Sequence, residues 1–381
     1  MGAFHAYDIR GIYNVDFDKD TAYRVGAFLP SLLGTDKVLV GRDCRVSSDE
    51  IHEYLLKGIT DAGADVYDIG LSTTPMVYFG TAKYGFDASV QITASHNPKE
   101  YNGMSTLFAK EIFGDAPEYI FDDMDGTFPN HEPNPLVHKN VVALEELVKK
   151  TGADAGVIYD GDADRVMFVD ETGKFVSPDL IIALLGHYFI DERGEKGIVI
   201  QDIRSSKAVG EYLEPMGAEM FTWKVGRANA ARKLRELDGV WGGELAGHYY
   251  FRDFFYSDSG LLASILVLRV LASMKRKGIS FSQLIGRIAG YENSGEINFR
   301  VEDKKGAMDA IRDHFTALQK PTAMMDFDGY RVEFSDWWFN IRPSNTEPYL
   351  RFICEATSAE LLEKRIEEVK DILFTRFGAT L

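Results

Sequence analysis

Three carboxylates stand at alternate positions in one short segment, at Asp160, Asp162 and Asp164, and Arg165 follows them. Carboxylates within about 4–6 Å of one another raise one another's pKa, so such a cluster is costly unless a cation joins it. Carboxylate oxygens are the ligands that Mg²⁺ and Ca²⁺ prefer in proteins. The segment therefore predicts a metal site, with an acidic surface turn that binds no metal as the alternative.

The same spacing resembles the calcium-binding loop of an EF-hand, in which Glu171 would take the twelfth position. The sixth position of that loop is a glycine, whereas here it is Arg165. The flanking residues 157–159 and 166–169 are mostly β-branched or aromatic and predict strands, whereas an EF-hand needs helices. Both departures argue against an EF-hand.

A second segment, Thr93 to Pro98, brings a hydroxyl and an imidazole together directly after an apolar run. Pro98 biases the residue before it away from helix. Ser95 and His96 are therefore expected in a turn at the carboxyl end of a strand, where open α/β sheets bind their ligands. Ser95 is a candidate nucleophile, and a strand-ending turn of small polar residues is the alternative.

A third segment, Asn340 to Pro348, suits an anion, and Arg351 follows it. The guanidinium of Arg342 is a planar fork that matches phosphate oxygens. The loop adds further donors from Ser344, Asn345 and Thr346. A capped turn between two strands is the alternative.

A fourth segment, Gly243 to His248, places Glu244 and His248 among glycines. Small neighbours permit the close approach of a ligand, and both side chains are able to hydrogen-bond sugar hydroxyls. A glycine-rich strand end explains the segment equally well.

The elements that must position these residues alternate between strand-like and helical patterns, which is typical of α/β layers. Strands are expected at residues 37–41, 64–69, 88–92, 117–121, 155–159, 197–200 and 219–222. Helices are expected at residues 51–62, 141–150, 179–192, 206–213 and 259–277. The last ninety or so residues differ, with strands near 296–299, 330–334 and 349–354 before a helix at 359–376, and predict a separate α+β domain.

Length and composition limit the class of protein. With 381 residues, 45% of them hydrophobic and 27% charged, the chain predicts a folded protein of two to four domains. A net charge of −17 opposes binding to nucleic acid, and no apolar stretch approaches the ~20 residues that cross a bilayer. The N-terminus lacks the pattern of a signal peptide and there are only two cysteines, so a cytoplasmic location is expected.

Taken in this order, the four segments resemble the α-D-phosphohexomutase superfamily, the phosphomannomutases and phosphoglucomutases of bacterial type. The resemblance runs essentially end to end, and it includes Tyr7 to Gly11, Asp125 to His131 and Lys224 to Arg227. It implies three related α/β domains, the second one truncated, and a C-terminal α+β domain around a central cleft. The four domains are expected at residues 1–104, 105–176, 177–292 and 293–381.

The resemblance implies a phosphohexomutase that interconverts hexose 1-phosphate and hexose 6-phosphate, of mannose, glucose or both, through a phosphoserine and a bisphosphorylated sugar. Ser95 would carry the phosphoryl group and would hold Mg²⁺ together with Asp160, Asp162 and Asp164. Arg10, His96 and Arg165 would be the other catalytic residues. The phosphosugar would be bound by Tyr7, Lys224, Arg227, Glu244, His248, Arg342, Ser344, Asn345, Thr346 and Arg351. A hexose 1,6-bisphosphate would act as activator.

The sequence departs from the family at two places. Ala246 stands where the family usually has serine, which removes a hydroxyl donor worth about 0.5–1.5 kcal/mol. Ser105 stands where the family typically has a lysine that serves in acid–base catalysis. Only 65 residues separate Ser95 from Asp160, fewer than in the family, which indicates an internal deletion after Met104.

Three functions are compatible with these features. The first is an active phosphohexomutase, and the second is a catalytically impaired phosphosugar-binding homologue that lacks the general acid/base and part of a sheet. The third, a phosphatase with an aspartate nucleophile, is disfavoured because the segment from Asp160 to Arg165 lacks the threonine or valine context of such enzymes. Neither the preferred sugar nor the oligomeric state is indicated.

Overall fold

The computed structural model describes residues 9–98, 118–121, 125–344 and 349–381. The chain divides into two compact units. Unit 1 comprises Met1–Pro178 and Ala246–Ser282, and unit 2 comprises Asp179–Leu245 and Gln283–Leu381. The chain therefore leaves unit 1 after residue 178 and returns to it at residue 246.

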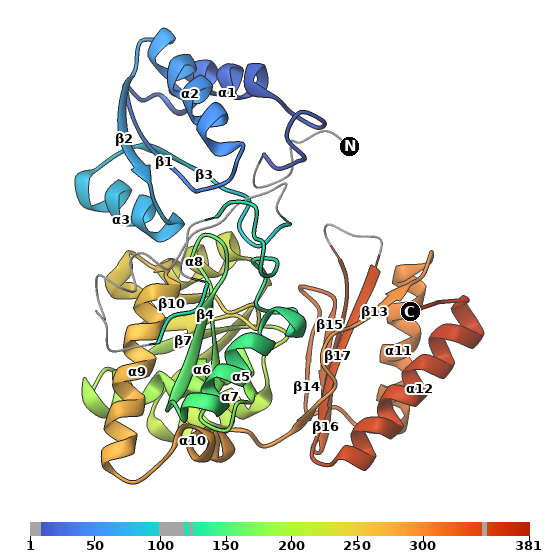
Figure 1. Ribbon diagram of the computed structural model, residues 1–381. Coiled ribbons are helices and arrows are strands. Elements are labelled where there is room, and N and C mark those ends of the chain that lie inside the picture. The colour runs from blue at the N-terminus through green and yellow to red at the C-terminus, as the bar shows by residue number, and fades with distance from the viewer. Residues whose placement is uncertain (1–8, 99–117, 122–124, 345–348) are drawn as a thin grey trace. The chain divides into compact units, whose positions relative to one another are not determined.

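Unit 1 opens with a parallel three-stranded sheet in the order β2-β1-β3. Because side chains alternate along a strand, Val38 and Val40 face one side of this sheet and Leu39 faces the other. Helices α1 and α2 cover the first face, and α3 lies against the second (Figure 1). The elements are β1 (Lys37–Arg42), β2 (Asp65–Leu71), β3 (Ala88–Ile92), α1 (Lys19–Leu33), α2 (Ser48–Asp61) and α3 (Thr74–Tyr84).

The second part of unit 1 is an antiparallel sheet in the order β4-β5-β6. All five residues of β5 are buried, and α5 and α9 both contact this strand. Its elements are α5 (Val142–Thr151), β4 (Ala155–Tyr159), β5 (Val166–Asp170), β6 (Phe175–Val176) and α9 (Gly260–Arg276), with a 3₁₀ turn at His138–Asn140. Strands β10 (Tyr249–Phe251) and β11 (Ser257–Asp258), joined by a 3₁₀ turn at Arg252–Phe254, also belong to unit 1 but pair antiparallel with each other in a different sheet. Helix α10 (Phe281–Ile288) follows α9 and leads the chain back to unit 2.

Unit 2 begins with α/β structure in which β7 pairs in parallel with both β8 and β9. The elements are α6 (Pro178–Leu184), a π-helical segment at His187–Glu192, β7 (Ile198–Asp202), α7 (Lys207–Leu213), a 3₁₀ turn at Glu214–Met216, β8 (Glu219–Trp223), α8 (Arg227–Glu236) and β9 (Trp241–Gly243). Trp241 is fully buried, and its indole NH donates to the Ile182 carbonyl.

The C-terminal part of unit 2 is an antiparallel sheet in the order β12-β17-β16-β15-β14, with β13 also paired to β17. Helices α11 and α12 pack on one face of this sheet (Figure 1) around a core that includes Phe315, Trp337 and Phe339. The elements are β12 (Glu292–Asn293), β13 (Ile297–Arg300), α11 (Lys304–Leu318), β14 (Ala323–Met325), β15 (Tyr330–Glu333), β16 (Trp337–Pro343), β17 (Tyr349–Ala356) and α12 (Ala359–Phe377).

The structure confirms most of the expected elements and corrects two. Residues 118–121, expected to belong to a strand, form no strand, because they find no pairing partner among the described residues. Residues 337–343, which the sequence did not predict as a strand, form β16, where Arg342 lies opposite Arg351 of β17. The α/β class and the C-terminal α+β part are confirmed, while the residue ranges of the four expected domains stay predictions.

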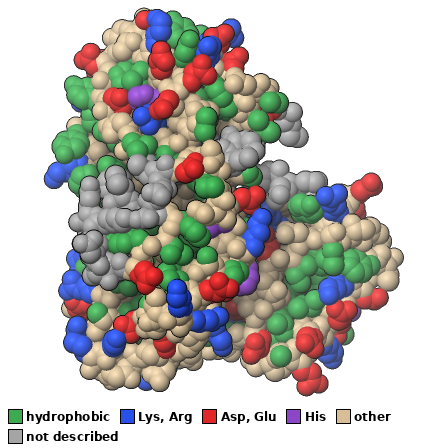
Figure 2. Space-filling model, viewed as in Figure 1, with side chains coloured by type: hydrophobic (Ala, Val, Ile, Leu, Met, Phe, Trp, Pro, Cys, Tyr) green, Lys and Arg blue, Asp and Glu red, His purple; other side chains and the backbone are tan. Residues whose placement is uncertain are grey.

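Among the described residues, no helix is both long enough and apolar enough to span a membrane. Acidic and basic side chains are interspersed over the described surface that faces the viewer in Figure 2.

Candidate active site

Three parallel strands of unit 1 end at one edge of their sheet, and each is followed by polar residues. Asp43 follows β1, Thr74 begins the helix after β2, and Ser95 lies three residues beyond β3. Carboxyl ends of parallel strands share one edge of a sheet, which is where α/β proteins bind ligands. The sequence pattern located Ser95 at this edge, and the sheet brings the other two residues to it.

The acidic segment forms the loop of a β-hairpin. Strands β4 and β5 pair antiparallel, with Tyr159 opposite Val166, and residues 160–165 connect them. The Asp160 amide donates to the Arg165 carbonyl over 3.3 Å and closes the loop. Strands on both sides exclude an EF-hand, as the sequence predicted.

All three carboxylates of this loop are buried, with at most 5% of any residue exposed. One oxygen from each of Asp160, Asp162 and Asp164 lies within 4.8 Å of the other two. Oδ1 of Asp162 and Oδ1 of Asp164 have no hydrogen-bond partner within the described parts of the chain. Buried carboxylate oxygens that converge without donors are the ligands that a hard divalent cation requires, so these residues fit Mg²⁺.

The electrostatics of the cluster support the same conclusion. Burial, and then the charge of Asp160, raise the pKa of Asp162 to about 7. Burial, followed by the charges of Asp162, Asp160 and Asp258, raises the pKa of Asp164 well above its ordinary value. A cation among the oxygens would favour the charged forms and oppose both shifts.

Ser95 lies against this loop. Its hydroxyl donates to Asp160 Oδ2 over 3.0 Å, and its Oγ also lies 3.0 Å from His96 Nδ1. Arg165 Nη2 donates to the same Oγ over 3.4 Å. The predicted nucleophile is thus in direct contact with one predicted metal ligand and with two of the predicted catalytic residues.

Arg165 is fixed by the carboxylate that also contacts Ser95. Its Nε donates to Asp160 Oδ2 over 2.9 Å, and its backbone NH donates to Asp160 Oδ1 over 3.2 Å. Burial acts to lower the pKa of Arg165, but the charges of Asp160 and Asp164 outweigh burial and raise it above the ordinary value. Arg165 is therefore a permanent cation beside Ser95.

The imidazole of His96 is uncharged at neutral pH. Burial, together with the positive charges of Arg165 and Arg10, lowers the pKa of His96 well below its ordinary value. A neutral imidazole is able to accept a proton. The structure therefore places a neutral base beside Ser95, whereas Ser105, which replaces the lysine of the family, lies outside the described residues, as does Met104.

His248 approaches the acidic loop from the segment before β10. It forms an antiparallel bridge with Arg165, and its Nδ1 lies 2.7 Å from Asp258 Oδ2 and 3.9 Å from Asp164 Oδ1. Gly260, at the start of α9, donates its amide to the Ala163 carbonyl, and a side chain at this glycine would collide with the loop. The last segment of unit 1, residues 246–282, thus packs against the acidic loop.

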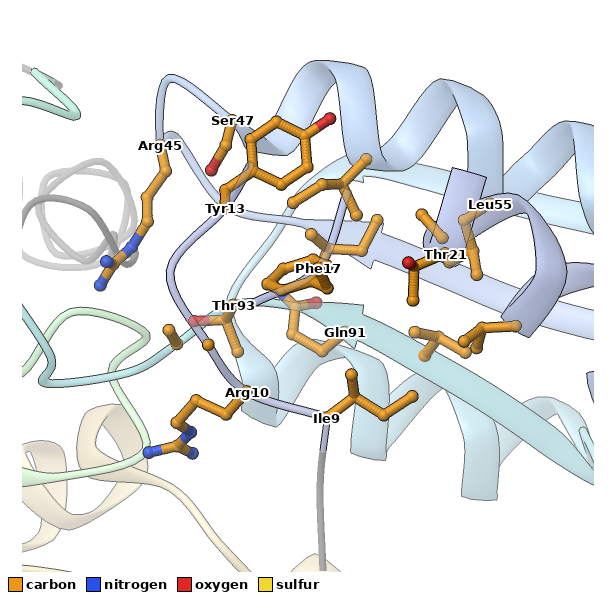
Figure 3. Close-up of a pocket in the computed structure, with 17 residues that line it drawn as sticks. Ile9, Arg10, Tyr13, Phe17, Thr21, Arg45, Ser47, Leu55, Gln91 and Thr93 are labelled. Atoms are coloured by element: carbon orange, nitrogen blue, oxygen red, sulfur yellow. The ribbon is translucent and has the colours of Figure 1, made fainter. Parts of the chain in front are cut away.

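A cavity of about 130 Å³ lies between the N-terminal residues and β3. Apolar groups from Tyr13, Phe17 and Leu55 line much of it (Figure 3). Arg10 and Arg45 stand at its rim, and both guanidinium groups point away from the apolar side chains. Arg10 Nη1 donates to the side chain of Asn97 over 3.4 Å, so Arg10 lies beside the serine loop.

The predicted sugar-binding residues Lys224, Arg227 and Glu244 lie in unit 2, where Lys224 and Arg227 are exposed and Glu244 is buried. The Glu244 carboxylate accepts the amide of Gly226 over 2.8 Å. The segment that holds Lys224 and Arg227 is thereby joined to Glu244.

The predicted phosphate-binding arginines gather around one carboxylate, that of Glu296. Arg351 Nη1 lies 3.1 Å from Glu296 Oε1, and Arg342 Nη2 lies 4.0 Å from Glu296 Oε2. Arg204, which the sequence did not single out, lies 3.9 Å from Glu296 and pairs with Asp202 at 2.8 Å. Burial and the positive charge of Arg204 lower the pKa of Arg342.

Ser344 donates its amide to the Tyr349 carbonyl over 2.9 Å. This hydrogen bond joins the two described residues that flank the segment 345–348. Tyr7, Asn345 and Thr346 lie outside the described residues, so their predicted roles have no structural counterpart here.

Sequence reasoning missed several residues of these sites, namely Asp43, Arg45, Thr74, Asp202, Arg204, Asp258 and Glu296. A signal was available for Asp43 and Thr74, since each follows a strand that runs parallel to β3. No local pattern marks Glu296, which reaches the arginines only through pairing of its neighbour strand with β17.

Models of known protein domains match most of the chain. Four models of phosphoglucomutase/phosphomannomutase domains match it: alpha/beta/alpha domain I at residues 1–115, domain II at 99–173, domain III at 177–291 and the C-terminal domain at 296–372.

Two relatives and one solved structure illustrate the likeness. The chain is 32% identical to a phosphomannomutase of Methanocaldococcus jannaschii, with 97% of each chain covered, and 32% identical to a protein named phosphohexose mutases of Xanthomonas campestris, with 98% and 99% covered. A phosphoglucomutase/phosphomannomutase family protein of Burkholderia thailandensis superimposes with a TM-score of 0.84 at 26% identity, over 98% of this chain and 97% of that one. The alignment with the first relative spans 445 positions, more than the 381 residues of this chain, so that relative carries residues that this chain lacks.

Proposed function

The chain belongs to the phosphoglucomutase/phosphomannomutase family and is a phosphohexomutase, and we propose that it interconverts hexose 1-phosphates and hexose 6-phosphates through a phosphoserine at Ser95. Mannose and glucose phosphates are the substrates that the family names suggest. The observation that carries the proposal is the contact of Ser95 with Asp160, because it joins a nucleophile to a buried acidic cluster that fits Mg²⁺.

In the first half-reaction, the bond between phosphorus and Ser95 Oγ breaks, and phosphorus bonds to the free hydroxyl oxygen of the hexose phosphate. Ser95 Oγ takes up a proton in exchange for the one that the sugar hydroxyl loses, so that a bisphosphorylated sugar and a free Ser95 hydroxyl result. Arg165, which lies 3.4 Å from Oγ, is placed to stabilise the charge on the transferring group. A divalent cation held by Asp160, Asp162 and Asp164 would neutralise further charge on the phosphoryl oxygens.

In the second half-reaction, Ser95 Oγ attacks the other phosphate of the bisphosphorylated sugar. The sugar oxygen leaves and takes up a proton to become a hydroxyl, and the product is the isomeric monophosphate. The Ser95 hydroxyl gives up its proton as the new bond forms, and the neutral imidazole of His96, 3.0 Å away, is the base that we assign to this step.

We assign the residues around Glu296 to the phosphate that the substrate keeps at each step. Arg342 and Arg351 supply planar guanidinium groups suited to phosphate oxygens. Glu244, Lys224 and Arg227 are assigned to the sugar, as is His248. A free hexose 1,6-bisphosphate would rephosphorylate Ser95 whenever the intermediate escapes, which is the reason to expect it as activator.

A coupled assay tests this function. The enzyme would be given mannose 1-phosphate or glucose 1-phosphate with Mg²⁺ and a trace of glucose 1,6-bisphosphate, and the 6-phosphate would be detected. We expect turnover that depends on both additions. Binding of the phosphosugars without any turnover would instead identify an impaired homologue.

We also propose a cytoplasmic location. Cys44 and Cys354 form no disulfide, as expected in a reducing compartment, and the phosphosugar substrates are charged small molecules. Fractionation of the source cells would test this proposal, and activity in a secreted fraction would contradict it.

A further inference from the structure

Arg45 has no role in the mechanism above, yet it is one of the most buried cations of unit 1, with 2% of its surface exposed. Its guanidinium reaches the serine loop, residues 95–98. Nη2 donates to the carbonyl oxygens of Ser95 and Asn97, over 3.1 Å each, and Nη1 donates to the Pro98 carbonyl over 2.7 Å. One side chain thus binds three carbonyls of the loop that carries the nucleophile.

The loop needs such support because its backbone is strained. Ser95 has φ of +52°, the left-handed region, which costs a residue other than glycine about 1–2 kcal/mol. Residues 95–98 belong to no helix or strand, so regular hydrogen bonding does not stabilise this conformation. Hydrogen bonds from a charged donor are stronger than those between neutral groups, and here they fix the carbonyls around the strained residue.

Arg45 is itself held at two points, its backbone amide and its guanidinium. Asp43, which is fully buried, accepts the Ser48 hydroxyl over 2.7 Å and the Arg45 amide over 3.4 Å. On the other side the guanidinium carbon lies 5.4 Å from the centre of the Phe128 ring, within the range of a cation–π interaction. The position of the guanidinium is therefore determined by its surroundings.

Phe128 belongs to the segment Asp125 to His131, which the sequence analysis singled out and the mechanism did not use. Asp125 stabilises the turn by accepting the amide of Thr127 over 2.9 Å. Gly126 packs so closely on the backbone of Cys44 that a side chain there would collide with the Cys44 carbonyl. The turn is therefore fitted to the segment that carries Arg45.

We propose that Arg45 is a positioning residue for phosphoryl transfer, which holds Ser95 in its reactive conformation through the loop carbonyls. The ring of Phe128 holds the Arg45 guanidinium in place. The inference rests on the proposed function, since it assumes that Ser95 carries the phosphoryl group. Arg45 acts on the backbone of the loop, whereas Arg165 and Asp160 contact the Ser95 hydroxyl.

The test compares Arg45→Lys and Arg45→Ala with Arg42→Lys, a control three residues earlier, at the end of β1, whose guanidinium pairs with the exposed Asp49 and donates to the Asp43 carbonyl. Lysine keeps the charge but cannot reach three carbonyls at once. A nucleophile displaced by about 1 Å loses roughly 100-fold in rate, so we expect Arg45→Lys to lower kcat by that order and to leave KM for the hexose phosphate nearly unchanged. Added guanidinium should partly restore kcat to Arg45→Ala and should not affect Arg42→Lys.

Phe128→Leu provides a second variant that keeps the apolar volume but removes the aromatic ring. The loss of about 1 kcal/mol of cation–π attraction predicts a fall in kcat of roughly fivefold. Equal kcat in folded Arg45→Lys and Arg42→Lys, or a change confined to KM, would overturn the proposal.

Amide hydrogen exchange of the peptide that contains residues 93–98 separates this proposal from the proposed function. Faster exchange in Arg45→Ala than in Arg42→Lys would support the hold of Arg45 on the loop, and equal exchange would contradict it. Wild-type protein that glucose 1,6-bisphosphate fails to phosphorylate would contradict the proposed function, whatever the exchange result.

Discussion

The Ser95 hydroxyl donates to Asp160 Oδ2 over 3.0 Å, although 65 residues separate the two in sequence. Ser95 lies just beyond β3 of the parallel sheet, and Asp160 is the first residue of the loop between the antiparallel strands β4 and β5. The contact therefore depends on two different sheets within unit 1, and it brings the proposed phosphoryl carrier to the acidic cluster.

The first prediction concerns the metal. Asp162→Asn keeps the size of the side chain but removes a charged ligand, so Mg²⁺ binding should fall sharply. We expect Mg²⁺ to raise the thermal midpoint of the wild-type protein, to leave that of Asp162→Asn unchanged, and to be required for turnover. Turnover that survives both EDTA and this substitution would rule out the metal site.

The second prediction concerns Thr74, whose hydroxyl donates to Asp162 Oδ2 over 2.5 Å. Thr74→Val keeps the shape but leaves the carboxylate without this donor. Residues that orient a metal ligand typically contribute about 10–100-fold in affinity, so we expect a loss of that order in a Mg²⁺ titration of the thermal midpoint. Thr81→Val is the matched control, since its hydroxyl donates only to the Val77 carbonyl within the same helix. A similar shift in both variants would show that Thr74 has no specific role.

Most of the elements that the sequence predicted are present, because hydrophobic periodicity is a local property, although helices α1, α3, α8, α10 and α11 were not predicted. The apolar runs at β1, β3 and β7 are strands within a residue or two of the expected bounds. Pairing is not local. Residues 118–121 have the composition of a strand but pair with no residue that the structure describes, and β16 extends to Pro343 because it pairs with β17 as far as Leu350.

The chemistry was predicted where the residues lie together in sequence. The acidic segment and Ser95 were found in this way, and the fold brings them into contact. Residues that reach the site from elsewhere were missed. Arg45 binds the serine loop across more than 50 residues, and Asp258 meets His248, ten residues earlier, because β10 and β11 pair.

The third prediction is a pH dependence of stability that arises at Glu355. Its carboxylate is buried and accepts hydrogen bonds from Ser206, Asn293 and Trp338. Burial, together with the charge of Asp179, raises the pKa of Glu355 from 4.5 to about 7. The folded state therefore keeps a proton that the unfolded state loses above pH 4.5, and stability decreases as the pH rises toward 7.

Such a shift corresponds to about 3 kcal/mol, and urea unfolding at pH 5 and pH 8 measures it. Glu355→Gln cannot titrate, so its free energy of unfolding should decrease less between the two pH values than that of the wild type. Identical decreases in the two proteins would assign the pH dependence to other groups.

The fourth prediction concerns Glu296, which lies among Arg204, Arg342 and Arg351. A carboxylate in this position competes with a phosphate for the same guanidinium groups. Glu296→Gln removes the negative charge and should lower KM for the hexose phosphate with little change in kcat. Arg342→Lys, which loses the planar fork, should raise KM. A higher KM in Glu296→Gln would instead mean that the carboxylate orients the arginines.

Peptide mass spectrometry of the phosphorylated protein tests the central assignment most directly. After incubation with glucose 1,6-bisphosphate and Mg²⁺ and removal of the sugar, fragmentation of the peptide that ends at Lys99 would locate the label. We expect one phosphate on Ser95 of the wild-type protein, and we expect it to be lost when hexose phosphate is added. The Ser95→Ala variant should carry no phosphate. A phosphate on any other residue, or turnover by Ser95→Ala, would contradict the account.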